Sequence, residues 1–503
     1  MGGGPLLRRG RRVLARGEAA RDRPGLPGLP DRGRGVTRID ADFPDAEYVV
    51  LSSRLIPDLD GGYTLATLAR ARQMAAAGVH GGRGPLLLTV DPGTPAEHAH
   101  HRAVFDGRDL VVDPGRMRNL FDEASDPDGG AAEWLRAAAH PGEPDPALEY
   151  RVVSDAADRP AVGLPVIAGD PDWHVSTAPV VVYDGAGRPA GIVDGFGALY
   201  RAWLDDVVRG LRGADPSRPV VVLCESRQLG ELLAGWDDPD VRLVHALHTI
   251  HLEPPYTPDA PVNGLWSRWF DLAERFDAVL WLTEGQRADA RERFGLDGVH
   301  VVVPHGVSAA SSVVPPADRD QGRVVMLNRL APGKRIDHAI RAFEGVVRAV
   351  PDARLDVYGE GAERDALQAL IDERGLGAHV VLRGATDAPD RVLDEASALL
   401  FTSAFEGQGL AILEALAHGC PVVAYDVRYG PREALAAGGG VLVPDGDVDA
   451  LTAGLVRVLD DVDTRVRLSH EAVDAARAVD PEHVMVALAS AVGDVLGRPS
   501  RRA

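Results

Sequence analysis

Arg329 and Lys334 are two cations five residues apart in the segment RLAPGK. Lysine and arginine together number 54, and Lys334 is the only lysine among them. An ammonium is a compact charge on a flexible stem, which suits a phosphate oxygen, whereas arginine is favoured where a planar fork can bind. The pair therefore indicates a site for a phosphate or diphosphate group. The alternative is a single lysine placed there by chance.

Glu406 and Glu414 are two carboxylates eight residues apart in FEGQGLAILEALAHG, one in a loop and one two turns into a helix. The amides at the start of a helix have no partner within it and attract partial negative charge. The residues that surround this helix start are Gly407, Gln408, Gly409 and Leu410. Two cations, a helix start and two carboxylates suit one ligand with an anionic part and a hydroxyl-rich part, such as a sugar attached to a diphosphate.

His248 and His251 form an H-x-x-H pair at the end of the buried run VRLVHALH. A histidine at the carboxyl end of a strand can face a ligand in a cleft. The alternative for either residue is a core histidine with no role in chemistry.

Gly61 and Gly62 form a turn between a short β-branched run, YVVLSS, and a helical segment. Glycines at this position would let a ligand approach the backbone and the start of the helix, which favours anions. A Gly-Gly pair is also common in a plain turn, so this signal is weak by itself.

The elements that would position these residues are clearest after residue 316, where strand-like and helix-like segments alternate. RVVMLNRL, RLDVYGEG, HVVLRGA, ALLFTSAF and PVVAYDV are typical of buried strands. Repeated βα units with short turns predict a parallel sheet covered by helices on both faces. Ligands of such sheets bind at the carboxyl ends of the strands, where Arg329, Lys334 and Glu406 fall.

The first half predicts a second parallel sheet, from YVVLSS, PVVVLCE, VRLVHALH and DAVLWLTE. Two such sheets place a cleft between them. VVVYDGAGRPAGIVDG predicts a β-hairpin, and we expect an antiparallel insertion at about 91–215. The fold class is therefore α/β, with two Rossmann-like, doubly wound domains. The expected parts are a tail at 1–45, a first domain at 46–315, a second at 316–480, and a helix at 481–503 that packs back on the first domain.

Composition excludes several classes of function. The formal net charge is −21, which argues against nucleic-acid binding. Residues 1–40 nevertheless have a balance of +6, from ten arginines and four acids. This head lacks the apolar core of a signal peptide and is rich in Pro and Gly, so we expect disorder. It either contacts anionic lipid or polymer, or is a passive extension or the product of a misplaced start codon.

Membrane and redox classes are also disfavoured. No run approaches eighteen uncharged apolar residues, so no integral membrane span is predicted. Cys224 and Cys420 lie far apart, which favours a reducing cytoplasm over a disulfide or metal framework. We expect a cytoplasmic protein, with peripheral contact at the inner membrane face as a further hypothesis. The strings Asp126-Pro-Asp128 and Asp445-Gly-Asp447 fit D-x-D, but chance produces them in so acidic a chain, and no metal site is predicted.

The segment FEGQGLAILEALAHGCPVVAYDV, with its E-x7-E spacing, resembles the retaining glycosyltransferases of family 4, which have the GT-B fold. RLAPGK is similar to the diphosphate-binding pair of that family. VYGEGAERDAL and VVLRGA are similar to its nucleotide-contacting segments. HTIHLEPPY, WLTEGQ, DVRYGPREAL and the YDGAGR hairpin resemble one subgroup, the bacterial poly(glycerol- or ribitol-phosphate) α-glycosyltransferases of wall teichoic acid. Related N-acetylglucosaminyltransferases of serine-rich adhesins share these features.

This resemblance implies a role for each matching residue. Arg329 and Lys334 would hold the donor diphosphate and stabilise the leaving group. Glu406 would contact the sugar hydroxyls, Glu414 the ribose hydroxyls, and His248 the reacting sugar, with His251 as the second choice. The remaining donor-binding residues that it implies are Gly61, Gly62, Gly359, Arg383, Gly407, Gln408, Gly409 and Leu410.

The implied reaction transfers glucose or N-acetylglucosamine from a nucleotide sugar, most simply a UDP-sugar, with retention and with no cofactor or metal. The implied acceptor is a hydroxyl of a polyol-phosphate polymer, a glycan or a protein, and the β insertion is a candidate surface for a homo-oligomer. Alternatives are an O-glycosyltransferase of serine-rich proteins and a non-catalytic glycosyltransferase-like subunit. A pyridoxal-dependent phosphorylase is disfavoured because the only lysine is assigned to the diphosphate.

Overall fold

The structure, a computed structural model, describes residues 38–59, 61–170 and 172–502. Most of the predicted tail, 1–45, lies outside the described residues. Its last part belongs to the fold instead: Ile39 and Ala41 are buried in the core, and the Ile39 amide donates to the carbonyl of Ala76. The folded part therefore includes residues before 46, because these apolar side chains cover the first helix and strand.

The first domain contains a seven-stranded parallel sheet with strand order β11-β10-β9-β8-β1-β2-β3. Its strands are β1 (Glu47–Ser52), β2 (Leu86–Thr89), β3 (Met117–Asn119), β8 (Val220–Cys224), β9 (Val241–Ala246), β10 (Ala278–Trp281) and β11 (His300–Val302). Its helices are α1 (Gly62–Ala76), α2 (Pro95–Gly107), α3 (Glu133–Ala138), α4 (Gly195–Arg212), α5 (Arg227–Leu233), α6 (Gly264–Leu272) and α7 (Glu284–Phe294).

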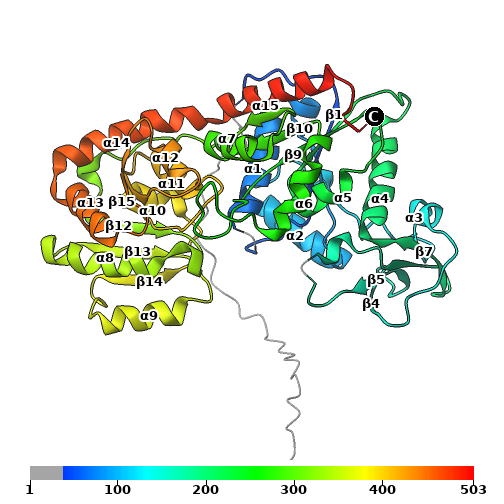
Figure 1. The fold of residues 1–503 in the computed structure, drawn as a ribbon, viewed down its shortest axis with the longest axis horizontal. Coiled ribbons are helices and arrows are strands. Elements are labelled where there is room, and N and C mark those ends of the chain that lie inside the picture. Colours follow the sequence, from blue (N-terminus) through cyan, green and yellow to red (C-terminus); the bar gives the residue numbers. More distant parts are fainter. Residues whose placement is uncertain (1–37, 60, 171, 503) are drawn as a thin grey trace, which may run out of the picture. The chain divides into compact units, whose positions relative to one another are not determined.

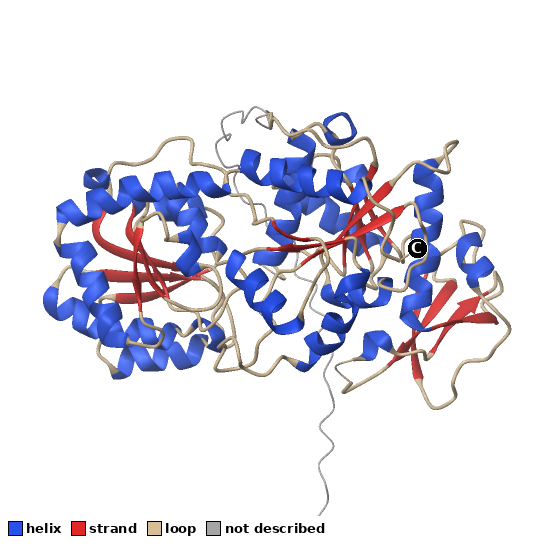
Figure 2. Ribbon diagram, turned by 45° about the horizontal axis from the view of Figure 1, so that its top comes forward, coloured by secondary structure: helices blue, strands red, loops and turns tan. Residues whose placement is uncertain are grey.

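Alternation along β1 explains how this sheet is covered on both sides. Val49 and Leu51 belong to one buried cluster, whereas Tyr48 and Val50 belong to another on the opposite face. Successive side chains of a strand point to opposite faces, so a strand that is apolar throughout must be buried on both. Figure 2 shows helices on both faces of the two parallel sheets.

The antiparallel insertion is narrower than the predicted 91–215. It consists of β4 (Glu149–Ser154), β5 (Pro160–Val166), β6 (Pro179–Tyr183) and β7 (Pro189–Asp194), paired in that order. Residues 95–119 form α2 and β3 instead, and β3 pairs parallel with β2. That stretch is rich in Asp and Gly, and its strand has only three residues. Such a strand is too short to show the alternation of apolar and polar residues by which a strand is recognised. The hairpin at YDGAGR joins β6 to β7, with the amide of Gly187 donating to the carbonyl of Asp184.

The second domain contains a six-stranded parallel sheet with strand order β14-β13-β12-β15-β16-β17. Its strands are β12 (Asp320–Leu327), β13 (Arg354–Tyr358), β14 (Val380–Gly384), β15 (Ala396–Phe401), β16 (Val422–Tyr425) and β17 (Gly440–Val443). Its helices are α8 (Ile336–Ala349), α9 (Arg364–Glu373), α10 (Pro389–Glu395), α11 (Leu410–Ala417), α12 (Pro431–Ala434), α13 (Val448–Asp460) and α14 (Val462–Ala476). Short 3-10 helices occur at Val79–Gly82, Pro114–Arg116, Trp173–Val175, Ala273–Arg275, Pro316–Asp318, Pro332–Lys334 and Arg477–Val479.

The C-terminal helix α15 (Pro481–Leu496) packs with the first domain and lies along α1 (Figure 1). Met485, Leu488 and Val492 share a buried cluster with Val50. None of the helices in the described residues is long and apolar enough to cross a membrane.

Candidate active site

A cleft of about 750 Å³ lies at the carboxyl ends of strands from both parallel sheets. The segments that follow β1, β8 and β9 line it on one side, and those that follow β12 and β15 line it on the other. This is the position expected for the ligand of a parallel sheet. The predicted residues that line it are Gly62, His248, Arg329, Lys334, Glu406, Gly407, Gln408, Gly409, Leu410 and Glu414.

Lys334 lies against Glu406, with 2.5 Å between Nζ and Oε1. Two contacts hold their loops together: the Thr402 hydroxyl donates to the carbonyl of Lys334, and the Ala404 amide donates to that of Gly333. Both side chains keep part of their surface open, 22% for Lys334 and 16% for Glu406. The ammonium has three donors, so it can hold Glu406 and still bind a second anionic oxygen.

Arg329 is exposed at the same cleft, and within the described part of the chain its guanidinium has no hydrogen-bond or ion-pair partner. A guanidinium offers five donors in a planar fork that matches phosphate oxygens. The cleft therefore contains two cations from the segment that follows β12. Lys334 is paired with Glu406, whereas Arg329 has no partner among the described residues.

The start of α11 faces the cleft through Gly409, whose φ of +87° is the left-handed conformation that suits glycine. The side-chain oxygen of Gln408 accepts a hydrogen bond from the His305 amide at 2.9 Å, which ties this turn to the first domain. The turn thus points the first amides of an eight-residue helix at the same space as the two cations.

Glu414 lies one turn into α11, not two as the sequence indicated, and lines the cleft. Burial, and then the charge of the nearby Asp390, raise the pKa of its carboxyl to about 7 against the opposing charge of His418. No hydrogen bond or ion pair engages this carboxyl among the described residues. It is a half-buried acid available to a ligand that donates hydrogen bonds.

His248 lies beyond β9 in the cleft, and three side chains fix its ring. Its Nε2 lies 2.5 Å from Oε2 of Glu225. The ring of His305 stacks on it with centroids 5.1 Å apart and an interplanar angle of 19°, and Tyr63 contacts it edge-on at 4.9 Å.

His251 has a different environment. It is 1% exposed and does not line the cleft. The aromatic rings of Phe270, Phe294 and Tyr429 surround it, and neither ring nitrogen has a hydrogen-bond partner in the described structure. Burial lowers the pKa of this histidine to about 4, with the charge of Arg293 acting in the same direction. The two members of the H-x-x-H pair are therefore one cleft residue and one core residue.

Three predicted residues lie outside the cleft lining. Gly61 precedes α1, with φ +48°, but only Gly62 reaches the cleft. Gly359 has φ +136°, and a Cβ there would lie 1.8 Å from the carbonyl oxygen of Asn328, so it serves a close backbone approach behind the cleft. Arg383 donates to Asp356 at 2.8 Å, a buried carboxylate that also binds Arg323, and so supports the sheet.

Several residues that line the cleft were not predicted. Glu225 and Tyr63 are examples, and His305 is another, from the HVVVPHGV segment. The rule that ligands bind at the carboxyl ends of strands would have found Glu225 and His305, because Glu225 directly follows β8 and His305 lies three residues beyond β11. Their partners come from other strands and helices, which no spacing along the chain shows.

The D-x-D strings have structural partners. Asp126 accepts the amide of Asp128 and binds Arg136. Asp445 binds Arg335, and Asp447 caps α13 by accepting the amide of Ala450.

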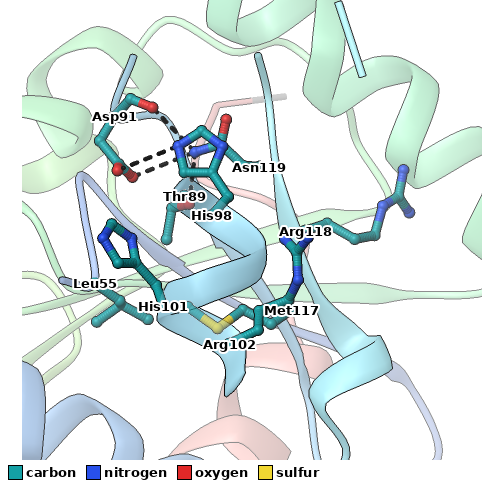
Figure 3. Close-up of a pocket in the computed structure, with 9 residues that line it drawn as sticks. All are labelled: Leu55, Thr89, Asp91, His98, His101, Arg102, Met117, Arg118 and Asn119. Atoms are coloured by element: carbon teal, nitrogen blue, oxygen red, sulfur yellow. Dashed lines mark hydrogen bonds and ion pairs between the residues drawn. The ribbon is translucent and has the colours of Figure 1, made fainter. Parts of the chain in front are cut away.

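A second, smaller hollow lies at the ends of β2 and β3, where α2 brings His98 and His101 near Asp91 (Figure 3). Burial lowers the pKa of His98, but the hydrogen bond to Asp122 and the ion pair with Asp91 outweigh it and raise the pKa to about 9. The hollow measures about 10 Å³, roughly the space for one water. It is therefore a closed polar network and not a second ligand site.

Residues 309–474 match the family model described as Glycosyl transferases group 1. Over 217 residues the chain is 31% identical to a poly(glycerol-phosphate) alpha-glucosyltransferase of Bacillus subtilis, and over 161 residues it is 32% identical to a poly(ribitol-phosphate) alpha-N-acetylglucosaminyltransferase of Staphylococcus aureus. These alignments cover 43% and 32% of this chain, and 32% of the length of either relative. The chain thus spans about a third of the length of these two curated relatives. The predicted resemblance of this segment to glycosyltransferases is confirmed.

Solved structures extend the likeness over most of the chain. TarM of S. aureus aligns with a TM-score of 0.69 at 17% identity, over 90% of this chain and 99% of that one. The pneumococcal O-GlcNAc transferase GtfA, solved with UDP and GlcNAc, aligns with a TM-score of 0.64 at 18% identity, over 90% of this chain and 100% of that one. At these identities the likeness shows the fold alone, and the predicted GT-B architecture is confirmed.

Proposed function

We propose that this chain, in which a glycosyl transferases group 1 domain occupies residues 309–474 of a GT-B fold, moves a hexose from a nucleotide diphosphate sugar to a hydroxyl acceptor. The observation that carries the proposal is the meeting of Arg329, Lys334 and the start of α11 with Glu406 and Glu414 in one cleft. Cations and amides suit a diphosphate, and carboxylates suit the hydroxyls on either side of it.

Departure of the nucleotide leaves negative charge on a phosphate oxygen. Cations fixed where that charge develops stabilise the transition state without reorganising. Lys334 is held by Glu406 and by its loop contacts, so its ammonium is already in place, and Arg329 is open to bind the same diphosphate. We propose that these two cations supply the charge that a divalent metal ion supplies in other transferases.

Retention of anomeric configuration is part of the proposal. The acceptor hydroxyl would attack on the face that the phosphate leaves, and a phosphate oxygen would take its proton. The C1–phosphate bond breaks as the C1–acceptor bond forms, and the proton ends on the released nucleotide. Pairing of Glu406 with Lys334 supports this route, because an ion-paired carboxylate is a weaker nucleophile.

For the acceptor, we propose a polyol-phosphate polymer, because two of the relatives are named as transferases to poly(glycerol-phosphate) and poly(ribitol-phosphate). A protein hydroxyl is the second candidate, since other relatives are named as peptide N-acetylglucosaminyltransferase subunits. We propose a UDP-sugar as the donor, because the peptide transferases are named for UDP-N-acetylglucosamine and because the resemblance implies the same donor.

The proposal is tested by incubating the purified chain with UDP- and GDP-linked hexoses and measuring nucleotide release, with and without glycerol-phosphate polymer, ribitol-phosphate polymer or a serine-rich peptide. Release from one donor that rises with one acceptor is expected, and NMR of the product would show the α anomer from an α-linked donor. If a chain that melts cooperatively releases no nucleotide from any donor, the alternative of a non-catalytic subunit is favoured.

A further inference from the structure

We infer that Glu225 is a positioning residue for the proposed transfer: its carboxylate holds the Nε2–H tautomer of His248, so that Nδ1 accepts a hydrogen bond from a hydroxyl of the bound sugar. The inference deepens the proposed function and rests on it.

Adjacent strands bring the two residues together. β8 and β9 pair in parallel, with Cys224 opposite His245, so Glu225 and His248 both leave the same edge of the sheet. The amide of Glu225 donates to the Leu51 carbonyl, which fixes its backbone against β1. Its carboxylate is 0% exposed and lies 2.5 Å from Nε2 of His248.

Arg70 keeps the carboxylate of Glu225 ionised in this buried position. Its Nε lies 3.4 Å from Oε1 of Glu225, and its own side chain is 4% exposed. Burial alone raises the pKa of Glu225, but the charge of Arg70, followed by the hydrogen bond to His248, lowers it overall. An ionised carboxylate can only accept. When the imidazole of His248 carries a single proton, that proton must therefore sit on Nε2.

The tautomer decides what His248 can bind. With Nε2 donating to Glu225, Nδ1 carries the lone pair, and an acceptor nitrogen attracts a hydroxyl but repels a phosphate oxygen. The diphosphate belongs beside Arg329 and Lys334, which come from the other sheet. His248 is thus assigned to the sugar. The stacked His305 is kept neutral, because burial holds its pKa well below the usual value.

The competing explanation is that Glu225 only balances the buried charge of Arg70. Glu225→Gln separates the two explanations, because the amide keeps the shape of the carboxylate but can offer His248 either a donor or an acceptor. Orienting carboxylates beside metal-bound histidines are worth roughly 10- to 100-fold, and we expect a fall of that size in kcat for donor hydrolysis. The Kd for UDP, which lacks the sugar, should stay within about twofold by calorimetry, since loss of the histidine contact leaves the diphosphate cations in place.

A double-mutant cycle gives the sharper test. If Glu225 acts through His248, the pair Glu225→Gln with His248→Ala should be no slower than His248→Ala alone, whereas independent effects would multiply. Asp356→Asn is the matched control, because Asp356 is also a buried, arginine-bound carboxylate but does not line the cleft. It should lower the Tm with little change in kcat. Multiplying effects in the cycle, or an unchanged kcat for Glu225→Gln, would overturn the inference.

NMR of ¹⁵N-labelled histidine gives a readout that needs no activity. The His248 signals, identified by their absence in His248→Ala, should show a protonated Nε2 and an unprotonated Nδ1, and Glu225→Gln should convert them to a mixture. Protonation of Nδ1 in the parent chain would overturn the inference even if the chain is active. If no nucleotide sugar is hydrolysed, the proposed function fails. The NMR measurement of the tautomer would still show whether Glu225 orients His248.

Discussion

The backbone carbonyl of His248 lies so close to Gly407 that a Cβ on residue 407 would stand 2.3 Å from its oxygen. Gly407 begins the turn that leads into α11 in the second domain, and His248 follows β9 in the first. The glycine is therefore required by a contact between the two sides of the cleft.

Gly407→Ala should force these two segments apart. Overpacking of this kind costs roughly 1–3 kcal/mol where it cannot relax, and here relaxation would open the cleft. We expect turnover to fall more than roughly tenfold, on the scale at which small misplacements cost rate. UDP binding should be kept, since Arg329 and Lys334 are both in the second domain. Gly377→Ala is the control, because nothing lies within 4 Å of a Cβ there. Normal turnover by Gly407→Ala would show that the contact is not needed.

Lys334→Arg should lose most transfer activity although the charge is kept. The planar guanidinium cannot occupy the place of an ammonium that lies 2.5 Å from Glu406 without displacing the phosphate oxygen. Lys334→Ala should be worse, by roughly two to three orders of magnitude in kcat, the scale of one lost transition-state contact. Donor hydrolysis measures both. An alanine variant with near-parental kcat contradicts the diphosphate role.

His248→Ala and His251→Ala should separate chemistry from packing. His248→Ala should melt within a few degrees of the parent, while turnover falls by roughly two orders of magnitude or more. His251→Ala leaves a cavity among aromatic rings and should lose roughly 2–5 kcal/mol of unfolding free energy, with a smaller effect on rate. His251→Phe should keep most of that stability, because neither ring nitrogen is bonded. The reverse pattern of rates and melting temperatures would exchange the two assignments.

Glu414 should make stability and nucleotide binding depend on pH. Its folded pKa of about 7 lies above the ordinary 4.5, so between these values the folded chain holds a proton that the unfolded chain has released. The free energy of unfolding contributed by this group therefore falls as pH rises from about 4.5 to 7. Ribose hydroxyls donate best to the ionised carboxylate, so UDP affinity should rise with pH through about 7. Glu414→Gln should flatten both profiles in denaturant titration and calorimetry. A variant that keeps the parental pH profile of UDP binding removes Glu414 from the ribose site.

Activity should persist in excess chelator, because Arg329, Lys334 and the start of α11 are proposed to stabilise the leaving diphosphate. Nucleotide release with and without EDTA measures this. A complete loss that magnesium or manganese restores would mean that the cations do not suffice.

The sequence by itself determined the two parallel-sheet domains, and most of the residues that it proposed for the site line the cleft. The alternating βα pattern is local, and the carboxyl ends of parallel strands must share one edge, so Arg329, Lys334, Glu406 and Glu414 could be placed together from the sequence. The sequence was less informative where the secondary-structure elements are short. The three-residue β3 was absorbed into the predicted insertion, and the hydrogen bond of Arg383 to Asp356 on the neighbouring strand was not foreseen.

Only the tertiary structure decided between His248 and His251. Both follow β9, three residues apart, and the spacing treats them alike. Their difference arises from what packs against each: Glu225 from β8 and His305 beyond β11 for one, and aromatic rings from α6, α7 and the second domain for the other. The burial and the electrostatic environment of a residue depend on elements that are distant in the chain. The type of a residue and its spacing from its neighbours in sequence therefore do not predict them.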